Sequence, residues 1–518
     1  MTNTTAPITI PCAIKEALPL NIYSVEAVRK LDSIAINEFS IPGYELMKRA
    51  GKAFFNYLQN TSPLARRILV CCGAGNNAGD GYVIATLAMK AGLDVNVISL
   101  VDTAKLQGDA RTAWQDWRSL GHQLADCSTA LVEQADVVVD ALLGTGLQRD
   151  VEGEWAELIN DINRCAKQVI SVDIPSGLCG DTGRVQGVAV CATATVTFIG
   201  VKKGLLTNQG VDYCGELQFD NLDIPQQVYE RQQAQVKRLS WAALCHQIKP
   251  RKASSYKHKH GHLLVLGGDK GMPGAARLAA EAALRAGAGL VTVVSHAEHA
   301  EILLAGCPEI MIHPTEDGRV PAELLAHARA IIVGPGLGKS LWSQNIFAAA
   351  VSSEAPKVID AGALRLLSEG DYGIKADTEL ENWVLTPHAG EAAALLGETA
   401  ECIQDSRFAS AELLQHKYAG HIVLKGAGSL LQSPDQLPRL CPYGNPGMAV
   451  AGMGDVLSGV IGALLAQGYK ASLACQLGVC IHSLAGDMAA EQGQIGMLAS
   501  DLYIGIRKLM NAEHKTQL

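Results

Sequence analysis

Short apolar segments alternate with amphipathic segments along both halves of this 518-residue chain. Each apolar segment is bounded by turn residues, as buried strands are, and stretches between them, such as residues 79–92, have helical periodicity. The predicted strands lie at residues 66–72, 93–101, 135–144 and 167–177, and again at 262–268, 289–295, 330–338, 356–360, 383–387 and 421–429. This alternation predicts an α/β fold in which crossover helices join parallel strands.

The most polar stretch of the chain separates the two series of strands. It covers residues 223–240, DIPQQVYERQQAQVKRLS, and we place the domain boundary within it, which gives domains at 1–225 and 226–518. Two helices are predicted ahead of the first strand, at 24–39 and 44–59, with Ser24 as the N-cap of the first. The N-terminal domain is expected to be a Rossmann-like domain of three layers.

Composition narrows the class of partner. The net charge of −9 argues against nucleic acid or an anionic membrane, and no apolar stretch reaches the ~18 residues of a membrane span. The N-terminal residues lack the basic and apolar regions of a signal peptide. The 14 cysteines contain no C-x-x-C pair, which indicates neither a zinc site nor a disulfide framework. We therefore expect a soluble, cytoplasmic homo-oligomer that acts on small molecules.

Polar residues follow three predicted strands of the first half. Because the carboxyl ends of parallel strands meet at one edge of a sheet, these residues should converge on one crevice. They are Asn76, Asn77, Asp80, Asp140, Gly144, Thr145, Gly146, Asp173 and Ser176. Residues 73–78 also fit a dinucleotide-binding pattern, but carboxylates beside a phosphate repel it unless a cation is present. The oxygens of Asn77, Asp140 and Ser176 suit a hard cation. The alternative is a set of ordinary turn residues.

A glycine-rich loop leads into an apolar helix at residues 444–468, GNPGMAVAGMGDVLSGVIGALLAQG. Backbone N–H groups of residues 451–455 would form an anion site at the helix N-terminus. The helix dipole should favour the ionised form of Asp455, which could accept a proton beside a phosphate. Lys425 and the N–H groups that follow it also suit a phosphate. The alternative is that Asp455 only caps the helix.

The segments GAGNNAGDG (73–81), DALLGTGL (140–147) and VDIPSG (172–177), preceded by LMKRAG (46–51), resemble the NAD(P)H-hydrate epimerase family. The resemblance implies a catalytic carboxylate at Asp173 and a K⁺ site at Asn77, Asp140 and Ser176. Lys202 matches a family lysine. Ala78 replaces a family glycine, and if the position needs a positive φ, alanine costs roughly 1 kcal/mol. The implied hydrate contacts are Asn76, Asn77, Ala78, Gly79, Asp80, Gly144, Thr145, Gly146, Leu147, Gln148, Arg149, Asp150 and Asp173.

The second half resembles ribokinase-like folds and, more closely, the ADP-dependent NAD(P)H-hydrate dehydratase family. The matching segments are GNPGMAVAGMGD (444–455), GPGLG (334–338), TPHAGE (386–391) and DKGMPGAA (269–276). Val450 departs from the family pattern, which has a small, usually hydroxylated residue there. Mg²⁺ is expected with the ADP. The resemblance implies hydrate contacts by Ala275, Gly336, His388 and Asp455, ADP contacts by Lys425, Gly426, Ala427, Gly428, Ser429 and Gly454, and Asp455 as the base.

Together the resemblances imply one enzyme with two activities. The first half would interconvert the R and S hydrates of NADH and NADPH. The second would use ADP to phosphorylate the hydroxyl of the S hydrate, so that phosphate leaves. Two alternatives remain open at this point: the second half could be a kinase for a small alcohol, and the first half a nucleotide-binding regulator without activity. A regulator has no need of Asp80, Asp140 and Asp173 beside phosphates.

Overall fold

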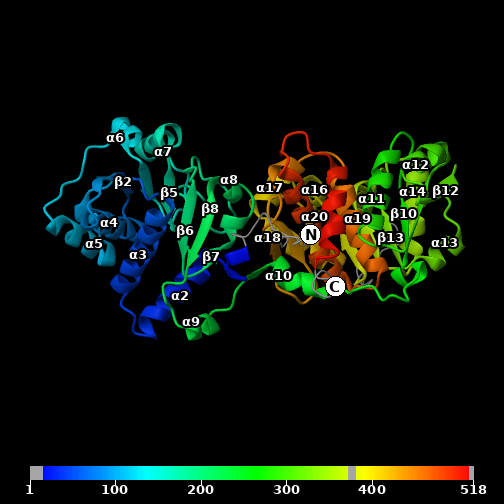
Figure 1. Cartoon of the computed structure of the whole chain (residues 1–518), viewed down its shortest axis with the longest axis horizontal. Helices are drawn as coiled ribbons and strands as arrows, with labels where there is room; N and C mark the ends of the chain where they lie inside the picture. Colours follow the sequence, from blue (N-terminus) through cyan, green and yellow to red (C-terminus); the bar gives the residue numbers. More distant parts are fainter. Residues whose placement is uncertain (1–15, 371–380, 513–518) are drawn as a thin grey trace, which may run out of the picture. The chain divides into compact units, whose positions relative to one another are not determined.

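The structure is a computed structural model that describes residues 16–370 and 381–512. The chain divides into two compact units (Figure 1). The N-terminal unit is Ala17–Lys237, and the C-terminal unit begins at Arg238 and also includes Glu16. The division falls within the polar segment 223–240, and the boundary at 225/226 stays a prediction.

A parallel sheet forms the centre of the N-terminal unit. Its strands lie in the order β3 (Asp94–Ser99), β2 (Arg67–Cys72), β4 (Val137–Ala141), β5 (Val169–Val172), β6 (Ala194–Phe198) and β8 (Glu216–Asp220). All neighbouring pairs are parallel. The strands β4, β5 and β6 are buried at every position, and burial on both faces explains their continuous apolar sequence.

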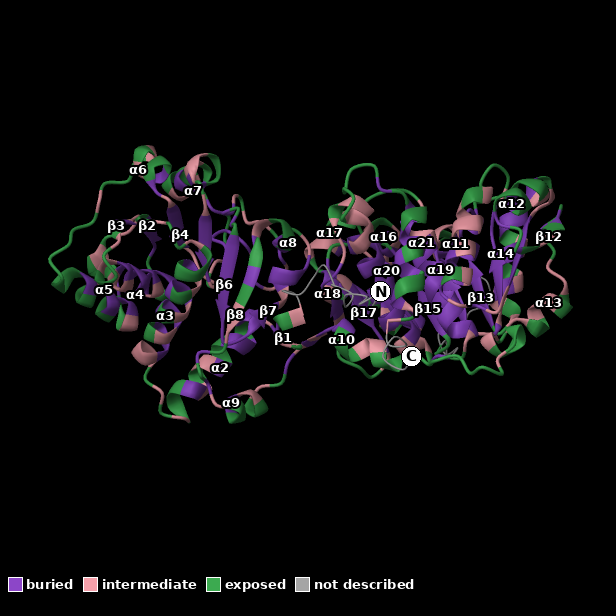
Figure 2. Cartoon of the chain, in the orientation of Figure 1, coloured by how far each residue is buried: buried purple, intermediate pink, exposed green. Residues whose placement is uncertain are grey.

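Helices cover both faces of this sheet and give three layers (Figures 1 and 2). On one face α2 (Val25–Asn37), α3 (Gly43–Thr61), α4 (Asn76–Lys90) and α5 (Gly108–Ser119) enclose a core that includes Phe54 and Trp117. On the other face α6 (Thr129–Gln134) and α7 (Gly153–Cys165) enclose a second core around Ile159. Ser24 caps α2, since its side chain accepts from the Ala27 amide at 3.2 Å. The smaller elements are β1 (Asn21–Tyr23), β7 (Val201–Lys202), β9 (Val236–Arg238), α8 (Gly210–Tyr213) and α9 (Gln226–Arg231).

The C-terminal unit also has an α/β fold, with a β-sheet of its own. Its strands lie in the order β12 (Met311–Thr315), β11 (Leu290–His296), β10 (His262–Leu266), β13 (Ala330–Val333), β14 (Lys357–Ile359), β15 (Trp383–Leu385), β16 (His421–Leu424), β17 (Ser429–Gln432) and β18 (Arg439–Cys441). The pairs from β12 to β16 are parallel, and those from β16 to β18 are antiparallel. The predicted α/β class is confirmed for both units.

Apolar helices form the core on one face of this second sheet. They are α11 (Pro273–Arg285), α19 (Met453–Ala466), α20 (Ala471–Ala490) and α21 (Leu502–Leu509). Within the described residues α20 alone is long and apolar enough to cross a membrane, and most of it is buried inside the unit, as a core helix is. The other helices are α10 (Trp241–Leu244), α12 (Ala300–Gly306), α13 (Ala322–His327), α14 (Leu341–Ser352), α15 (Ala361–Glu369), α16 (Ala389–Leu396), α17 (Ala400–Asp405) and α18 (Arg407–Tyr418).

Candidate active sites

The carboxyl ends of β2, β4 and β5 meet at a cavity of about 860 Å³ in the N-terminal unit. Most of the predicted hydrate contacts line it, from all three strand ends: Asn76, Asn77, Asp80, Gly144, Thr145, Gly146, Leu147, Gln148, Arg149 and Asp173. Three predicted contacts lie elsewhere, because Ala78 and Gly79 are buried in α4 and Asp150 is exposed outside the lining. The sequence thus predicted the convergence, while the part that each residue plays stays a prediction.

The glycine loop after β2 is shorter than its sequence indicates, because α4 already begins at Asn76. Ala78 therefore has a helical backbone and is fully buried, so the cost considered for a positive φ does not arise. The glycines around it are explained by close packing. A Cβ at Gly73 would lie 1.9 Å from the Leu142 carbonyl oxygen, and one at Gly79 would lie 2.5 Å from the Met47 side chain.

Asp140 is completely buried at the end of β4. Its carboxylate accepts hydrogen bonds from Ser171 Oγ at 2.7 Å and from the amide and Oγ of Ser176 at 2.9 and 2.5 Å. Asn77 Nδ2 donates to the Leu143 carbonyl at 3.3 Å, and Ser176 Oγ lies 3.2 Å from the same oxygen. The structure thus brings the three predicted cation ligands together. Burial raises the pKa of Asp140, and the serine hydrogen bonds oppose that rise without supplying a positive charge.

Asp173 follows β5 in a left-handed backbone conformation, with φ of 64°. Its Oδ1 accepts from the Phe198 amide at 3.1 Å, from Thr197 Oγ1 at 3.3 Å and from Lys202 Nζ. The Lys202 side chain is 1% exposed, and it also donates to Thr197 Oγ1 at 3.0 Å. A non-glycine residue with positive φ is strained and persists where its surroundings fix it, as these contacts do.

Two further carboxyl groups share the cavity with Asp173. Burial and the charges of Asp173 and Asp32 raise the pKa of Asp80 well above its usual value. Burial and the Asp173 charge raise the pKa of Asp32 to about 6, against the opposing effect of Lys202. Sequence reasoning missed Asp32, although a signal existed. It lies four residues after Val28 in a predicted helix, so it is a carboxylate beside the apolar face.

In the C-terminal unit, α19 begins at Met453 after Gly452, which has φ of 88°. Asp455 is in its first turn and half-buried. The helix dipole is not the dominant influence on this carboxyl group. Burial and the negative charge of Asp360 instead raise the pKa of Asp455 to about 7, and the positive charge of Lys425 only partly opposes them. Desolvation of a carboxylate outweighs a dipole worth about 0.3–1 kcal/mol.

Lys425 holds a buried ion pair beside Asp455. Its Nζ lies 2.8 Å from Asp360 Oδ1 and 3.6 Å from Glu391 Oε2, while Ser458 Oγ donates to Asp360 Oδ2 at 2.6 Å. Burial alone would raise the pKa of Asp360, but these partners outweigh it and lower the pKa. The lysine expected to meet a phosphate thus has a carboxylate partner. Sequence reasoning missed Asp360. A signal existed, because Asp360 is at the end of a predicted strand, and polar residues at strand ends were the signal used in the first half.

The loop after Lys425 is fixed from beneath by a buried arginine. Arg407 of α18 donates to the Leu424 and Gly428 carbonyl oxygens, both at 3.3 Å. Gly426 has φ of 140°, and a Cβ there would lie 2.7 Å from Arg407. The carbonyl groups therefore point toward the guanidinium. The predicted ADP contacts at residues 425–429 lie in this loop, next to Gly454, where a Cβ would lie 3.2 Å from Lys425 Nζ.

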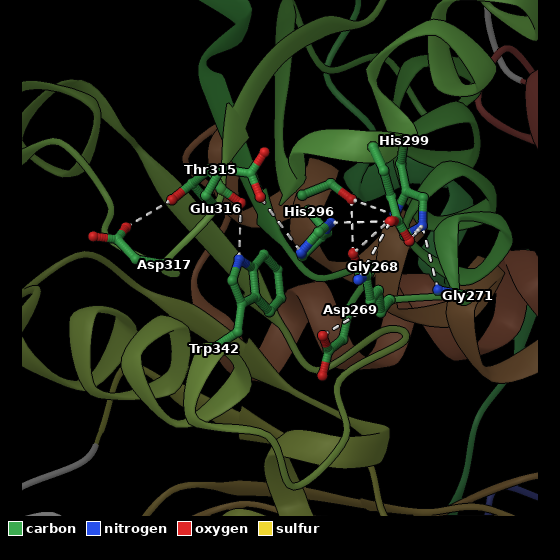
Figure 3. Close-up of polar contacts among 12 residues, drawn as sticks. Gly268, Asp269, Gly271, His296, His299, Thr315, Glu316, Asp317 and Trp342 are labelled. Atoms are coloured by element: carbon green, nitrogen blue, oxygen red, sulfur yellow. Dashed lines mark hydrogen bonds and ion pairs between the residues drawn. The ribbon is translucent and has the colours of Figure 1, made fainter.

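A network of polar contacts fixes the loop that precedes α11 (Figure 3). Ser295 Oγ donates to the Gly268 carbonyl at 2.8 Å, and the Gly271 amide donates to His299 Nε2 at 3.3 Å. His299 is 5% exposed, so this loop is anchored in the unit rather than lying free on its surface.

Two segments singled out in the sequence meet at this loop. The Asp269 amide donates to the Gly336 carbonyl at 2.9 Å, and Gly336 has φ of 69° with no room for a Cβ beside the Met272 carbonyl. The predicted hydrate contact Ala275 lies just beyond, in the first turn of α11. The predicted hydrate contact His388 caps α16, since its Nδ1 accepts from the Gly390 amide at 3.0 Å, and its Nε2 lies 3.5 Å from Glu391 Oε1.

Two family models match the chain. The YjeF-related protein N-terminus matches residues 43–204, and NAD(P)H-hydrate dehydratase matches residues 263–508. The bifunctional NAD(P)H-hydrate repair enzyme Nnr of Coxiella burnetii is 43% identical over 95% of this chain and 99% of its own length. The Escherichia coli enzyme of that name is 39% identical over 96% of this chain and 95% of its own length.

The chain belongs to the bifunctional NAD(P)H-hydrate repair enzymes. The assignment of an epimerase half followed by a dehydratase half is confirmed, and it favours the repair enzyme over a kinase or a regulator. The ADP/ATP-dependent NAD(P)H-hydrate dehydratase of Bacillus subtilis, solved after co-crystallisation with ATP and Mg²⁺, is 26% identical over 52% of this chain and 95% of its own, with a TM-score of 0.46.

Proposed function

We propose that the N-terminal unit of this repair enzyme interconverts the R and S hydrates of NADH and NADPH through Asp173, and that the C-terminal unit dehydrates the S hydrate with ADP through Asp455. The observation that carries the proposal is a lysine beside each aspartate: Lys202 pairs with Asp173 itself, and Lys425, whose charge acts on Asp455, pairs with the neighbouring Asp360. Cytoplasmic location and homo-oligomeric assembly stay predictions.

Hydroxide is a poor leaving group, and phosphorylation of the hydroxyl solves that problem. Asp455, with a pKa of about 7, is suited to take the hydroxyl proton as the oxygen attacks the phosphoryl group of ADP. The N-terminal amides of α19 and the loop at 425–429 would hold the phosphates. Mg²⁺ would neutralise phosphate charge there, and it is usually held by phosphates together with one or two carboxylates. Glu391, whose Oε2 lies 3.6 Å from Lys425 Nζ, is a carboxylate that fits.

The epimerase unit is suited to hold K⁺ near its cavity. Asp140 is buried with uncharged donors, so a monovalent cation beside Ser176 and the Leu143 carbonyl would balance its charge. The oxygen ligands are of the kind that hard cations prefer. Replacing K⁺ by tetramethylammonium, which is too large for such a site, should slow epimerisation and leave dehydration unchanged. Equal epimerase rates in both salts after dialysis would remove K⁺ from the mechanism.

One experiment tests the whole proposal. A mixture of hydrate epimers is incubated with the protein, ADP, Mg²⁺ and K⁺, and the absorbance of the reduced nicotinamide is followed together with inorganic phosphate. Both should rise in equal amounts until the whole mixture is consumed. A stable phosphate ester without the gain in absorbance would identify a kinase, and consumption of the S epimer alone would mean that the first unit does not epimerise.

A further inference from the structure

A carboxyl group that the sequence did not single out faces the reaction space of the epimerase unit. Asp32, on α2, lines the same cavity as Asp80, Asp173 and Lys202. We propose that Asp32 is the second proton-transfer group of the epimerase, working in partnership with Asp173. The inference rests on the proposed role of Asp173 and extends it.

The two carboxyl groups reach the cavity from different elements and with different partners. Three donors hold Oδ1 of Asp173, and that oxygen is thereby fixed as a hydrogen-bond acceptor. Asp32 comes from α2, next to Val28 in the cavity wall, and it interacts with Asp173 and Lys202 through their charges. A proton-accepting group and a proton-donating group that line one cavity from different elements can form an acid–base pair.

Inversion at the hydroxylated carbon requires such a pair. C6 of the hydrated ring carries a hydroxyl and N1, so it is a hemiaminal. The base takes the hydroxyl proton, the electrons of the O–H bond form a C=O bond, and the C6–N1 bond breaks. N1 receives the electrons of that bond and a proton from the acid. Rotation about C5–C6 and the reverse steps close the ring on the other face and return both protons. The reaction is a net isomerisation without any other reactant.

We assign the acid to Asp32 and the base to Asp173. Burial and the Asp173 charge raise the pKa of Asp32 to about 6, so Asp32 loses its proton as the pH rises through that value. If the protonated form is required, epimerase kcat/KM should fall about tenfold per pH unit above this pKa. Asp32 interacts through charge with Asp80 from α4, Asp173 after β5, Lys202 from β7 and Tyr229 from α9. On α2 itself, Arg29 lines the same cavity.

The test compares Asp32→Asn with Glu26→Gln in the full-length protein. Glu26 lies on the same helix, outside the cavity, and its side chain is 78% exposed, so its substitution controls for the loss of a carboxylate from α2. Pure R hydrate is supplied without ADP, and the S epimer is measured by chiral separation between pH 5 and 9. We expect kcat to fall about 10²–10⁴-fold in Asp32→Asn, with KM little changed and the alkaline limb absent. Glu26→Gln should match the wild type.

Two further variants make each outcome decisive. Asp32→Glu keeps the carboxyl group and should recover part of the rate, with a shifted alkaline limb. If Asp32→Asn does not fold, this variant still tests whether the carboxyl group transfers a proton. Asp173→Ala is measured in parallel. A slow Asp173→Ala with a normal Asp32→Asn would overturn the inference and leave the proposed function intact, whereas wild-type rates in both would overturn the proposed function. A raised KM with an unchanged kcat and pH profile would make Asp32 a binding residue and overturn the inference.

Discussion

Asp173 and Asp455 are the proposed catalytic carboxylates of the two units, and their surroundings differ in where the positive charge lies. In the N-terminal unit Lys202 pairs directly with the proposed catalytic carboxylate. In the C-terminal unit the corresponding lysine, Lys425, pairs with the neighbouring Asp360 instead, and Asp455 keeps a raised pKa of about 7. The lysine therefore lies against the proposed catalytic carboxylate in one site and against a neighbouring carboxylate in the other.

In the C-terminal site, burial and the charge of Asp360 account for the raised pKa of Asp455, and the charge of Lys425 opposes them only in part. An ammonium group shared with a second carboxylate compensates two negative charges only in part. We expect that removing the charge of one proposed catalytic carboxylate changes the activity of its own unit alone. The following predictions test that separation.

The largest effect is expected for Asp455→Asn. Removal of a positioned general base costs about 10²–10⁴-fold in rate, so dehydration of the S hydrate should almost disappear while the R and S hydrates still equilibrate. Absorbance of the reduced nicotinamide measures the first activity and chiral separation the second. Glu412→Gln, which removes an exposed carboxylate on α18, is the control and should match the wild type. Near wild-type dehydration in Asp455→Asn would remove this residue from the base role.

Asp173→Ala should leave repair of the S hydrate intact and block use of the R hydrate. Given a mixture of epimers and ADP, this variant should restore cofactor up to the S fraction and then stall, because the R hydrate is no longer converted. The expected 10³-fold loss of epimerase rate corresponds to about 4 kcal/mol of transition-state stabilisation. Adding the Asp455→Asn variant, whose epimerase unit is unchanged, should release the stall. Consumption of the mixture in one fast phase would mean that Asp173 is not catalytic or that the second site accepts both epimers.

The pH dependence of dehydration should have the opposite sign to that of epimerisation. Burial raises the pKa of Asp455 to about 7, so the ionised base is present above that pH and is lost as the pH falls. The value of kcat/KM for the S hydrate should drop about tenfold per unit below pH 7. If kcat/KM stays constant between pH 5.5 and 8, either the pKa of Asp455 lies outside that range or Asp455 does not act as the base.

The sequence carried much of this architecture because its signals were local. Apolar runs predicted the strands, and polar residues at strand ends predicted the cavity that contains Asn77 and Asp173. The C-terminal glycine loop predicted the start of α19 with Asp455 in its first turn. The strands and the start of α19 are decided by neighbours in the chain, and the convergence at the cavity follows from the general rule that the carboxyl ends of parallel strands meet at one edge of a sheet.

The parts that were missed depend on residues far apart in the sequence. Lys425 and Asp360 are separated by 65 positions, and only the folded sheet brings them together. The pKa of Asp455 follows from that pair and from burial, which the spacing of residues does not encode. Asp32 is another case, because its effect depends on Asp173 at the end of a distant strand.

The smallest effect is expected where the sequence departs from its family, at Ala78. The helical backbone and full burial of this residue mean that alanine is well suited to the position. Ala78→Gly should reduce the free energy of unfolding of the N-terminal unit by about 1–2 kcal/mol, of which about 1 comes from helix propensity and the rest from the lost methyl contacts. Epimerase kcat/KM should not change. Denaturant unfolding followed by circular dichroism measures the first quantity, with separate transitions fitted for the two units.

The control for that measurement is Ala130→Gly, at an exposed position in α6, which loses no buried methyl contacts and should cost less. The comparison separates two explanations of the departure. If the family glycine serves only close packing of α4, alanine is tolerated here because the surrounding side chains leave room for its Cβ. If it serves the hydrate, the glycine variant should gain epimerase activity. A severalfold rise in kcat/KM without loss of stability would establish the second explanation, and it would show that the backbone at Ala78 moves when the hydrate binds.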